Sequence, residues 1–321
     1  MQRVVALLAT VLVATALGAC DGDGAEPGAS KEATLVLDFQ PNAVHAGIYA
    51  ALERGYFELE GVALEIREPS ASTDAPKLLA AGRAEFALLD IHDLAIARER
   101  GLELVGVAAI VQRPLAAVIA GDRDAVRKPG DLAGGTVGVT GLPSDDAVLD
   151  AVLEAGEIDP ASVERITIGF DSIAALSAGR VDAATAFWNA EGVALRRLDV
   201  PTREFRVDDY GAPRYPELVL VTSEELLAED PKLVDGVVAA LEEAYGQVVE
   251  EPDAALAELL GAVPELGEAE QRAQLDALLA ADAFTPPARL DRRALRAWAA
   301  WDLDHGVVAE PVNVEEAFAL D

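Results

Sequence analysis

The stretch TLVLDFQPNAVHAGIYAALERGYFELEGVALEI, which runs from Thr34 to Ile66, decides the fold. It begins with the apolar run TLVLDF, continues as a helical pattern with an Ala/Ile/Leu face, and ends in the apolar run VALEI. Gly55 lies where the helical pattern stops, as is usual at a helix C-terminus. A strand, a helix and a second strand in this order predict an α/β protein with a parallel sheet.

The same alternation continues in two series along the chain. The first ends with ELVGVAAIV at residues 103–111, and the second runs from TVGVT to VDAATAF at residues 136–187. The segments LLAAGRAEFALLD (Leu78–Asp90) and ALSAGRVDAATAF (Ala175–Phe187) hold matching places in the two series. Both contain the end of a helix, then Ala-Gly-Arg, an acidic residue and an apolar strand. We therefore predict two similarly built lobes.

The division into lobes follows from where the second series begins and ends. After Tyr215 the chain has one more apolar run, ELVLVT, and is then helical in pattern to its end. This pattern assigns residues 33–113 and 217–321 to lobe 1, and residues 114–216 to an inserted lobe 2. The crossing segments RPLAAVIA and YPELVLVT would form the hinge. A chain of 321 residues suits two domains of ordinary size.

The N-terminus has the pattern of a secretory signal. MQR supplies a positive start, and the apolar run that follows is shorter than the roughly 20 residues of a membrane span. LGAC, at Leu17–Cys20, resembles a lipobox. We expect residues 1–19 to be a signal peptide, Cys20 to be lipidated, and residues 20–32 to form a flexible tether. The protein would then be exported and anchored on the outer face of the cytoplasmic membrane; a buried core cysteine is the alternative.

Composition excludes several classes of function. The formal net charge of −32 argues against nucleic acid and against an anionic membrane surface as partners. Cys20 is the only cysteine, so the mature chain has no disulfide framework and no thiolate metal site. The histidines are His45, His92 and His305, and the sequence has none of the common catalytic motifs. We expect a monomeric protein without catalytic residues, metal or cofactor.

The candidate site lies where strands end. In open α/β sheets, ligands bind in the crevice beyond the carboxyl ends of the strands, so polar residues that follow each strand are the candidates. They are Asn42 and His45 after the first strand; Ser70, Ser72 and Thr73 after the second; Asp90 and His92 after the third; and Ser144, Trp188, Asn189 and Glu191 in the second series.

Structural interpretations stay open for some of these residues. His45 and His92 are equally well explained as packing histidines, and Ser144 as a helix cap. Asp145 and Asp146 fall in a first helical turn, which favours acidic residues through the helix dipole. By contrast, a tryptophan, an amide and a carboxylate within residues 188–191 favour an aromatic ligand that also forms hydrogen bonds.

Several stretches together resemble the periplasmic solute-binding proteins for thiamine pyrimidine precursors. The resemblance is carried by Asp38–Ile66, LLAAGRAEFALLDIHDLA, GVTGLPSDDAVLDAVLEAG, the segment from FWNAEG to SEELL, and GVVAEPVNVEEAF; it covers nearly all of Ala33–Phe318. It implies a type II periplasmic binding protein fold. It also implies that hydroxymethyl- or formylaminomethyl-aminopyrimidine is delivered to the permease and ATPase subunits of an ABC importer.

The fungal enzymes that make the thiamine pyrimidine share this fold, and the chain departs from them at key positions. A functional histidine of these enzymes matches His92. Their pyridoxal phosphate lysine, however, falls near Leu88 and Leu89, and their cysteine cluster is missing near DDYGAPRYPE. The resemblance therefore implies binding rather than synthesis.

The resemblance also suggests contacts for the ligand. The pyrimidine ring would stack against Trp188 and against Tyr49 or Tyr215. Its ring nitrogens and exocyclic amine would meet three polar side chains: Asn42, Asn189 and Glu191.

Other ligands and other classes of protein remain alternatives. Riboflavin is also a stacking heterocycle. An alkanesulfonate, taurine or nitrate would need donors, which PSASTDAP (Pro69–Pro76) and Arg113 offer. The alternatives of another class are an enzyme of the fungal synthase type and a structural or adhesive lipoprotein.

Overall fold

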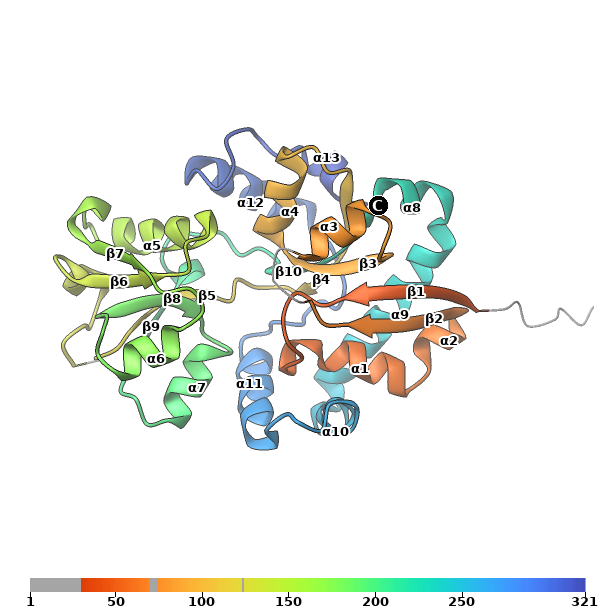
Figure 1. Cartoon of the computed structure of the whole chain (residues 1–321), viewed down its shortest axis with the longest axis horizontal. Helices are drawn as coiled ribbons and strands as arrows, with labels where there is room; N and C mark the ends of the chain where they lie inside the picture. The colour runs from red at the N-terminus through yellow and green to blue at the C-terminus, as the bar shows by residue number, and fades with distance from the viewer. Residues whose placement is uncertain (1–29, 70–73, 123, 321) are drawn as a thin grey trace, which may run out of the picture.

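The computed structural model describes residues 30–69, 74–122 and 124–320. Within these ranges the strands form two five-stranded sheets, which lie side by side in Figure 1. The signal peptide (1–19), Cys20 and most of the expected tether lie outside the described residues, as do Ser70, Ser72 and Thr73. In the part of the chain that is described, no helix is long and apolar enough to cross a membrane.

The first sheet has the strand order β2-β1-β3-β10-β4. β1 pairs in parallel with β2 and β3, whereas β10 runs antiparallel to both β3 and β4. The bounds are β1 (Lys31–Val36), β2 (Val62–Arg67), β3 (Phe86–Asp90), β4 (Leu104–Val111) and β10 (Leu218–Ser223).

The second sheet repeats this plan in the order β7-β6-β8-β5-β9. β6 pairs in parallel with β7 and β8, and β5 runs antiparallel to β8 and β9. The bounds are β5 (Ala116–Ala120), β6 (Thr136–Val139), β7 (Glu164–Thr167), β8 (Ala183–Phe187) and β9 (Arg203–Arg206). In each sheet the fourth strand, β10 or β5, directly follows a segment that crosses between the lobes.

Helices cover both faces of the first sheet (Figure 1). On one face lie α1 (Ala46–Glu53), α2 (Tyr56–Leu59), α9 (Pro231–Glu250) and α10 (Pro252–Ala262); on the other lie α3 (Asp74–Ala80), α4 (Ile91–Glu99), α12 (Arg292–Asp304) and α13 (Val314–Ala317). Successive strand residues point to opposite faces, so Leu35 and Val36 of β1 join different apolar cores. Burial on both faces explains why β3, β4 and β10 are nearly continuous apolar runs, whereas β2, at the edge of the sheet, alternates buried and exposed residues.

The second sheet is covered in the same way. α5 (Pro143–Ala155) lies on one face, and α6 (Ser172–Ser177) and α7 (Glu191–Arg197) lie on the other. α11 (Glu268–Ala280) belongs to the C-terminal helices but lies beside α7, between the two sheets (Figure 1). The remaining helices are α8 (Glu224–Glu229) and the 3₁₀ turns η1 (Ala43–His45), η2 (Pro129–Leu132), η3 (Pro160–Ser162) and η4 (Val207–Asp209).

The sequence echo has the same structure in both lobes. After α3, Gly82 adopts φ +60° and closes the helix with paired backbone bonds; after α6, Gly179 does so with φ +63°. The acidic residue that follows then anchors the neighbouring strand. The carboxylate of Glu85 accepts the N–H of Thr34 at 2.7 Å, and that of Asp182 accepts the N–H of Thr136 at 2.8 Å. The two segments thus perform the same task at the third strand of each sheet.

Two expectations about strands need correction. β1 begins at Lys31, inside the expected tether. The helix after β1 ends near Gly55 as expected, because Gly55 adopts φ +70° and separates α1 from the short helix α2. β9 was not expected, because REFR is short and has no apolar run. The division into residues 33–113 plus 217–321 and residues 114–216 stays a proposal, which the strand membership of the two sheets supports.

Candidate functional site

A cavity of about 490 Å³ lies between the two lobes, and its walls come from both. Lobe 1 contributes the segments after β1 and β3 and the start of α11. Lobe 2 contributes the segments after β6, β7 and β8. These are largely the carboxyl ends of parallel strands, where ligands bind in open α/β sheets.

Two exposed phenyl rings face each other at this cavity. Phe39 follows β1 and Phe170 follows β7, so they come from opposite lobes. The two residues are 48% and 63% exposed, although both are large and apolar. The ring centroids are 6.2 Å apart and the rings are tilted by 41°. A pair of exposed aromatic rings in a cavity offers stacking surface to a flat ligand.

Three amide residues in the cavity wall have unpaired oxygens. Asn189, Gln271 and Gln274 are 2%, 5% and 4% exposed, and the side-chain carbonyl oxygen of each is buried without a hydrogen-bond partner in the described protein. Buried polar groups are ordinarily paired, because an unpaired one loses its bonds to water without compensation. The cavity therefore presents hydrogen-bond acceptors that a ligand with N–H or O–H groups would satisfy.

The cavity is also rich in carboxyl groups. Its acidic lining residues are Asp38, Asp90, Asp93, Asp145, Glu191, Glu217, Glu265 and Glu270. The described lining residues include no lysine or arginine. Burial raises the pKa of Glu191, and nearby Asp145 adds to the rise; burial together with the Asp90 carboxylate raises the pKa of Asp93 to about 7. The site favours positive or hydrogen-donating groups over anions.

Glu217 connects the cavity to the hinge. Its Oε2 atom accepts the backbone N–H of Leu115 in the other crossing segment at 2.6 Å. The Asp90 carboxyl lies close by, and burial raises the pKa of both carboxyl groups. Burial raises the pKa of Glu217 well above its ordinary value, and Asp90 raises it further. One buried carboxyl thus ties both crossing segments together beside the cavity.

His92 lines the cavity but is held by a buried network. Its Nδ1 lies 2.7 Å from Asp302 Oδ1, and its Nε2 lies 3.1 Å from the hydroxyl of Tyr215. Burial alone lowers the pKa of His92, but Asp302, Asp90 and Glu217 together outweigh it and raise the pKa to about 10. Trp298 Nε1–H also lies 3.3 Å from Nδ1, so Asp302, Tyr215 and Trp298 together hold the imidazole in place.

The structure places six of the ten expected site residues in the cavity wall. They are Asn42, Asp90, His92, Ser144, Asn189 and Glu191. Asn42 caps η1, where its Oδ1 accepts the N–H of Val44. Glu191 begins α7, and its Oε2 accepts the N–H of Phe187 at 3.0 Å. Ser144 forms no cap, since no side chain caps α5.

The other four expected residues, His45, Tyr49, Trp188 and Tyr215, are buried and do not line the cavity. His45 contacts the cavity lining indirectly, through Asp38. Its Nδ1 accepts the N–H of Asn42, so its Nε2–H donates to Asp38 Oδ1 at 2.8 Å. His45 thereby orients a carboxylate that does line the cavity.

Trp188 is not in a position to stack against a ligand. It is fully buried, and its Nε1–H donates to the carbonyl of Pro114 at 2.9 Å. The Arg206 guanidinium lies 4.0 Å from the ring centroid. Trp188 therefore packs against the crossing segment, and the sequence interpretation missed the two phenyl rings that face the cavity.

The remaining polar candidates are engaged in structural contacts. Arg113 Nε lies 2.9 Å from Asp208 Oδ2, and Arg113 does not line the cavity. Asp146 pairs with Arg165 at 2.8 Å. Asp145 lines the cavity, but its Oδ2 already accepts hydrogen bonds from the N–H of Thr140 and the hydroxyl of Thr185.

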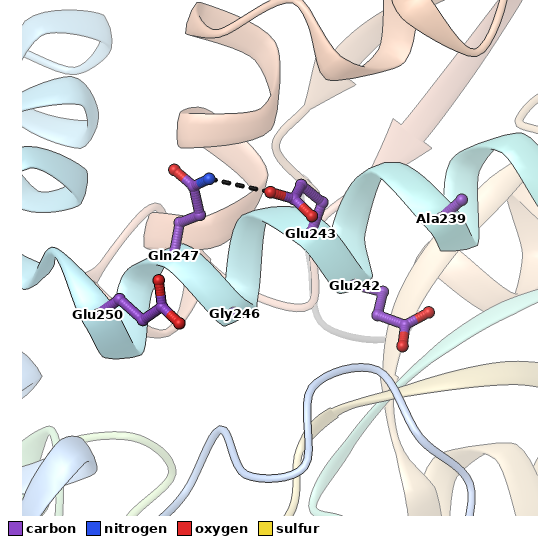
Figure 2. A pocket seen from close by; sticks show the side chains of 6 residues that line it. All are labelled: Ala239, Glu242, Glu243, Gly246, Gln247 and Glu250. Atoms are coloured by element: carbon purple, nitrogen blue, oxygen red, sulfur yellow. Dashed lines mark hydrogen bonds between the residues drawn. The ribbon is translucent and has the colours of Figure 1, made fainter.

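A second hollow, of about 270 Å³, lies along one face of α9 (Figure 2). Its lining residues are Ala239, Glu242, Glu243, Gly246, Gln247 and Glu250. Gln247 donates to Glu243 at 2.9 Å within this face. All its residues come from one helix and none is shared with the cavity between the lobes, so this hollow is a shallow acidic surface and not part of the site.

Comparisons with known proteins show a family and a fold for this chain. Residues 42–255 match the model of the family described as NMT1/THI5 like. The chain is 31% identical over 327 residues to the formylaminopyrimidine-binding protein of Halalkalibacterium halodurans, with 99% of this chain and 98% of that protein covered. It is 25% identical over 236 residues to the 4-amino-5-hydroxymethyl-2-methylpyrimidine phosphate synthase of Legionella pneumophila, with 73% and 74% covered.

Among solved structures, the fold resembles that of the alkanesulfonate-binding protein SsuA from Xanthomonas axonopodis pv. citri bound to MOPS. The TM-score is 0.70, at 18% identity, and the match covers 92% of this chain and 99% of that one. The expected two-lobed α/β binding-protein fold is thereby confirmed.

Proposed function

Because the chain belongs to the NMT1/THI5-like family and has a periplasmic binding-protein fold, we propose that it captures an aminopyrimidine thiamine precursor for an ABC importer. Its relatives and fold support the broader role of solute binding. The observation that carries the choice of ligand is the cavity itself. It combines two exposed phenyl rings with carboxylates and unpaired amide oxygens.

The phenyl rings suit a flat heterocycle. A ring held between Phe39 and Phe170 needs two van der Waals gaps, about 7 Å in total. The centroids are 6.2 Å apart, so the rings must separate by about 1 Å, through opening of the lobes or rotation of the side chains, to admit a ligand. Binding proteins of this kind open to admit a ligand and then close around it.

The polar lining suits an exocyclic amine. An amine that donates to Glu191 forms a charge-assisted hydrogen bond, which is stronger than a neutral one. Asn189 lines the same cavity and offers its unpaired Oδ1, whereas Asn42 lines it with an amide that already bonds to Gln40 and Val44. A sulfonate or nitrate would instead meet eight acidic residues. Arg113, the donor considered for such an anion, is engaged with Asp208.

The cavity does not fit the pyridoxal phosphate chemistry of the fungal synthases. Leu88 and Leu89 line it where the resemblance places the lysine of those enzymes. Neither side chain carries an amine that could form a Schiff base. We therefore assign this chain to binding, although it is also similar to the Legionella synthase.

Export and anchoring belong to the same proposal. The signal-like residues 1–19 and Cys20 would place a monomeric protein on the outer face of the cytoplasmic membrane, where it would deliver its ligand to the permease and ATPase subunits.

The test is isothermal titration calorimetry on the purified full-length chain. Formylaminomethyl- and hydroxymethyl-aminopyrimidine are titrated, with riboflavin and taurine as comparators. We expect a Kd of about 1 μM or tighter, near −8 kcal/mol, for at least one pyrimidine and no binding of the comparators. Binding of riboflavin or taurine alone would overturn the ligand assignment, and no binding of any of them would overturn the solute-binding proposal.

A further inference from the structure

We propose that Asn189, Gln271 and Gln274 form an amide subsite that binds an N–H-bearing substituent of the ligand and so selects among aminopyrimidines. The inference rests on the proposed function, since it concerns a second region of the same cavity. It adds residues of α11, which neither the strand-end pattern nor the resemblance brought to the site.

The subsite is built from both lobes. Gln271 and Gln274 are three residues apart on α11 and therefore lie on one face of that helix. Asn189 lies two residues before the start of α7, and α7 packs against α11 (Figure 1). Arg197 Nη1 of α7 donates to the carbonyl of Ala269 of α11 at 2.9 Å, an exposed hydrogen bond between the two helices.

Each amide is buried yet incompletely paired. All three residues line the cavity, and their carbonyl oxygens have no hydrogen-bond partner among the described residues. The orientation of Gln274 is set by its neighbour, because its Nε2 donates to Glu270 Oε1 at 3.4 Å and a carboxylate only accepts. Its Oε1 is therefore the free atom. Folded proteins rarely leave three buried acceptors unpaired along the wall of one cavity, since each loses its bonds to water.

The chemistry of the missing partner follows from these groups. Carbonyl oxygens accept hydrogen bonds, so the partner must donate. A secondary amide or an amine meets this need, and the carboxylates of Glu265 and Glu270 in the same wall also favour such groups. A methyl group meets none of it and would leave all three oxygens unpaired. A site built for hydrogen bonds discriminates strongly against an analogue that lacks the donor.

The experiment compares two ligands that share the ring. One is formylaminomethyl-aminopyrimidine; the other is the same aminopyrimidine with a plain methyl group in place of that substituent. The protein is the full-length chain, as wild type and as the double variant Gln271→Met, Gln274→Met. Gln247→Met, on α9 and outside the cavity, is the matched control.

We expect the wild type and Gln247→Met to bind the formylaminomethyl ligand at least tenfold more tightly than the methyl ligand. In the double variant we expect the two ligands to bind about equally. Its affinity for the formylaminomethyl ligand should fall, and its affinity for the methyl ligand should stay unchanged. The Tm of the double variant is expected to stay level or rise, because methionine removes unpaired buried oxygens. The single variants are used if the double variant fails to fold.

Three results would overturn the inference. One is equal binding of the two ligands by the wild type. Another is an equal loss for both ligands in the double variant with a lower Tm, which marks a structural role for the glutamines. Failure of the wild type to bind any aminopyrimidine would refute both the proposed function and the subsite. The other two results would refute the subsite alone.

Discussion

Replacement of Phe170 by alanine tests the stacking surface directly. Phe170 lies in lobe 2 with its ring 6.2 Å from that of Phe39 in lobe 1. If the ligand ring enters between them, truncation removes one of its two stacking partners. The folded protein loses little, since the residue is 63% exposed. The variant therefore separates ligand affinity from stability.

The magnitude follows from the exposed fraction. Full burial of a phenylalanine side chain is worth about 1.5–3 kcal/mol, and ring stacking adds about 0.5–1.5 kcal/mol. A ligand that covers the exposed 63% of Phe170 recovers about 1–2 kcal/mol from burial. Because the two contributions overlap, we expect a loss of about 2 kcal/mol, which raises Kd about thirtyfold.

Calorimetry and thermal unfolding are measured on three variants. Phe170→Tyr keeps the ring and should bind like the wild type. Trp188→Phe removes the donor to the Pro114 carbonyl and should lower stability by about 1–3 kcal/mol. Wild-type affinity in Phe170→Ala, together with a binding loss in Trp188→Phe at unchanged Tm, would refute the assignment of stacking to the phenyl rings.

Three further predictions concern carboxyl groups. Glu191→Ala should weaken pyrimidine binding at least tenfold in calorimetry, which corresponds to about 1.4 kcal/mol of binding free energy. Glu191→Gln should lose less affinity, because glutamine can still accept the N–H of Phe187. Equal affinity in the wild type and both variants removes Glu191 from the site. Burial raises the pKa of Asp93 to about 7, above the value of an aspartate in the unfolded chain. The stability contributed by this pKa difference is therefore fully present below about pH 4 and is lost as the pH rises toward 7. Asp93→Asn should therefore raise the Tm at pH 7 more than at pH 4, and an equal change at both pH values contradicts this. Glu217→Ala should lower the free energy of unfolding, measured in urea, by about 1–3 kcal/mol, because the N–H of Leu115 loses its acceptor. Glu217→Gln should lower it less. An equal decrease in both variants shows that the hydrogen bond between Glu217 and Leu115 is unimportant.

The fold was predictable because hydrophobic periodicity reports it directly. Most strands of both sheets lie within short apolar runs of the sequence. The glycines at positions 82 and 179 mark equivalent helix ends. β9 was not predicted, because Arg203–Arg206 pairs only at the edge of its sheet and therefore needs little apolar surface. Strand-end reasoning found the polar residues for the same reason that it found the strands: topology brings those ends together.

The aromatic part of the site was harder to predict, because the sequence does not show which way a ring points. Trp188 follows β8 but packs against the crossing segment, whereas Phe39 and Phe170 follow their strands and face the cavity. The run ERITIGF, residues 164–170, has the composition of a strand that would include Phe170. β7 ends at Thr167, however, and Gly169 turns the chain with φ +57°.

The glutamines of α11 left a weaker signal. Gln271 and Gln274 share the buried side of the helix with Leu275 and Leu278. Polar residues within an apolar helical stripe require partners in the fold. Which partner they face depends on how α11 packs against α7, and that contact between distant segments is not readable from helical periodicity.

The position of β10 has a consequence for the order in which the protein folds. β10 lies between β3 and β4, so β4 has no neighbouring strand in its sheet until residues 218–223 arrive. All five strands of the second sheet lie within residues 116–206, a contiguous stretch made before β10. On a chain that emerges from its N-terminus, the inserted lobe can therefore complete its sheet first, while the apolar strand β4 waits uncovered on one edge.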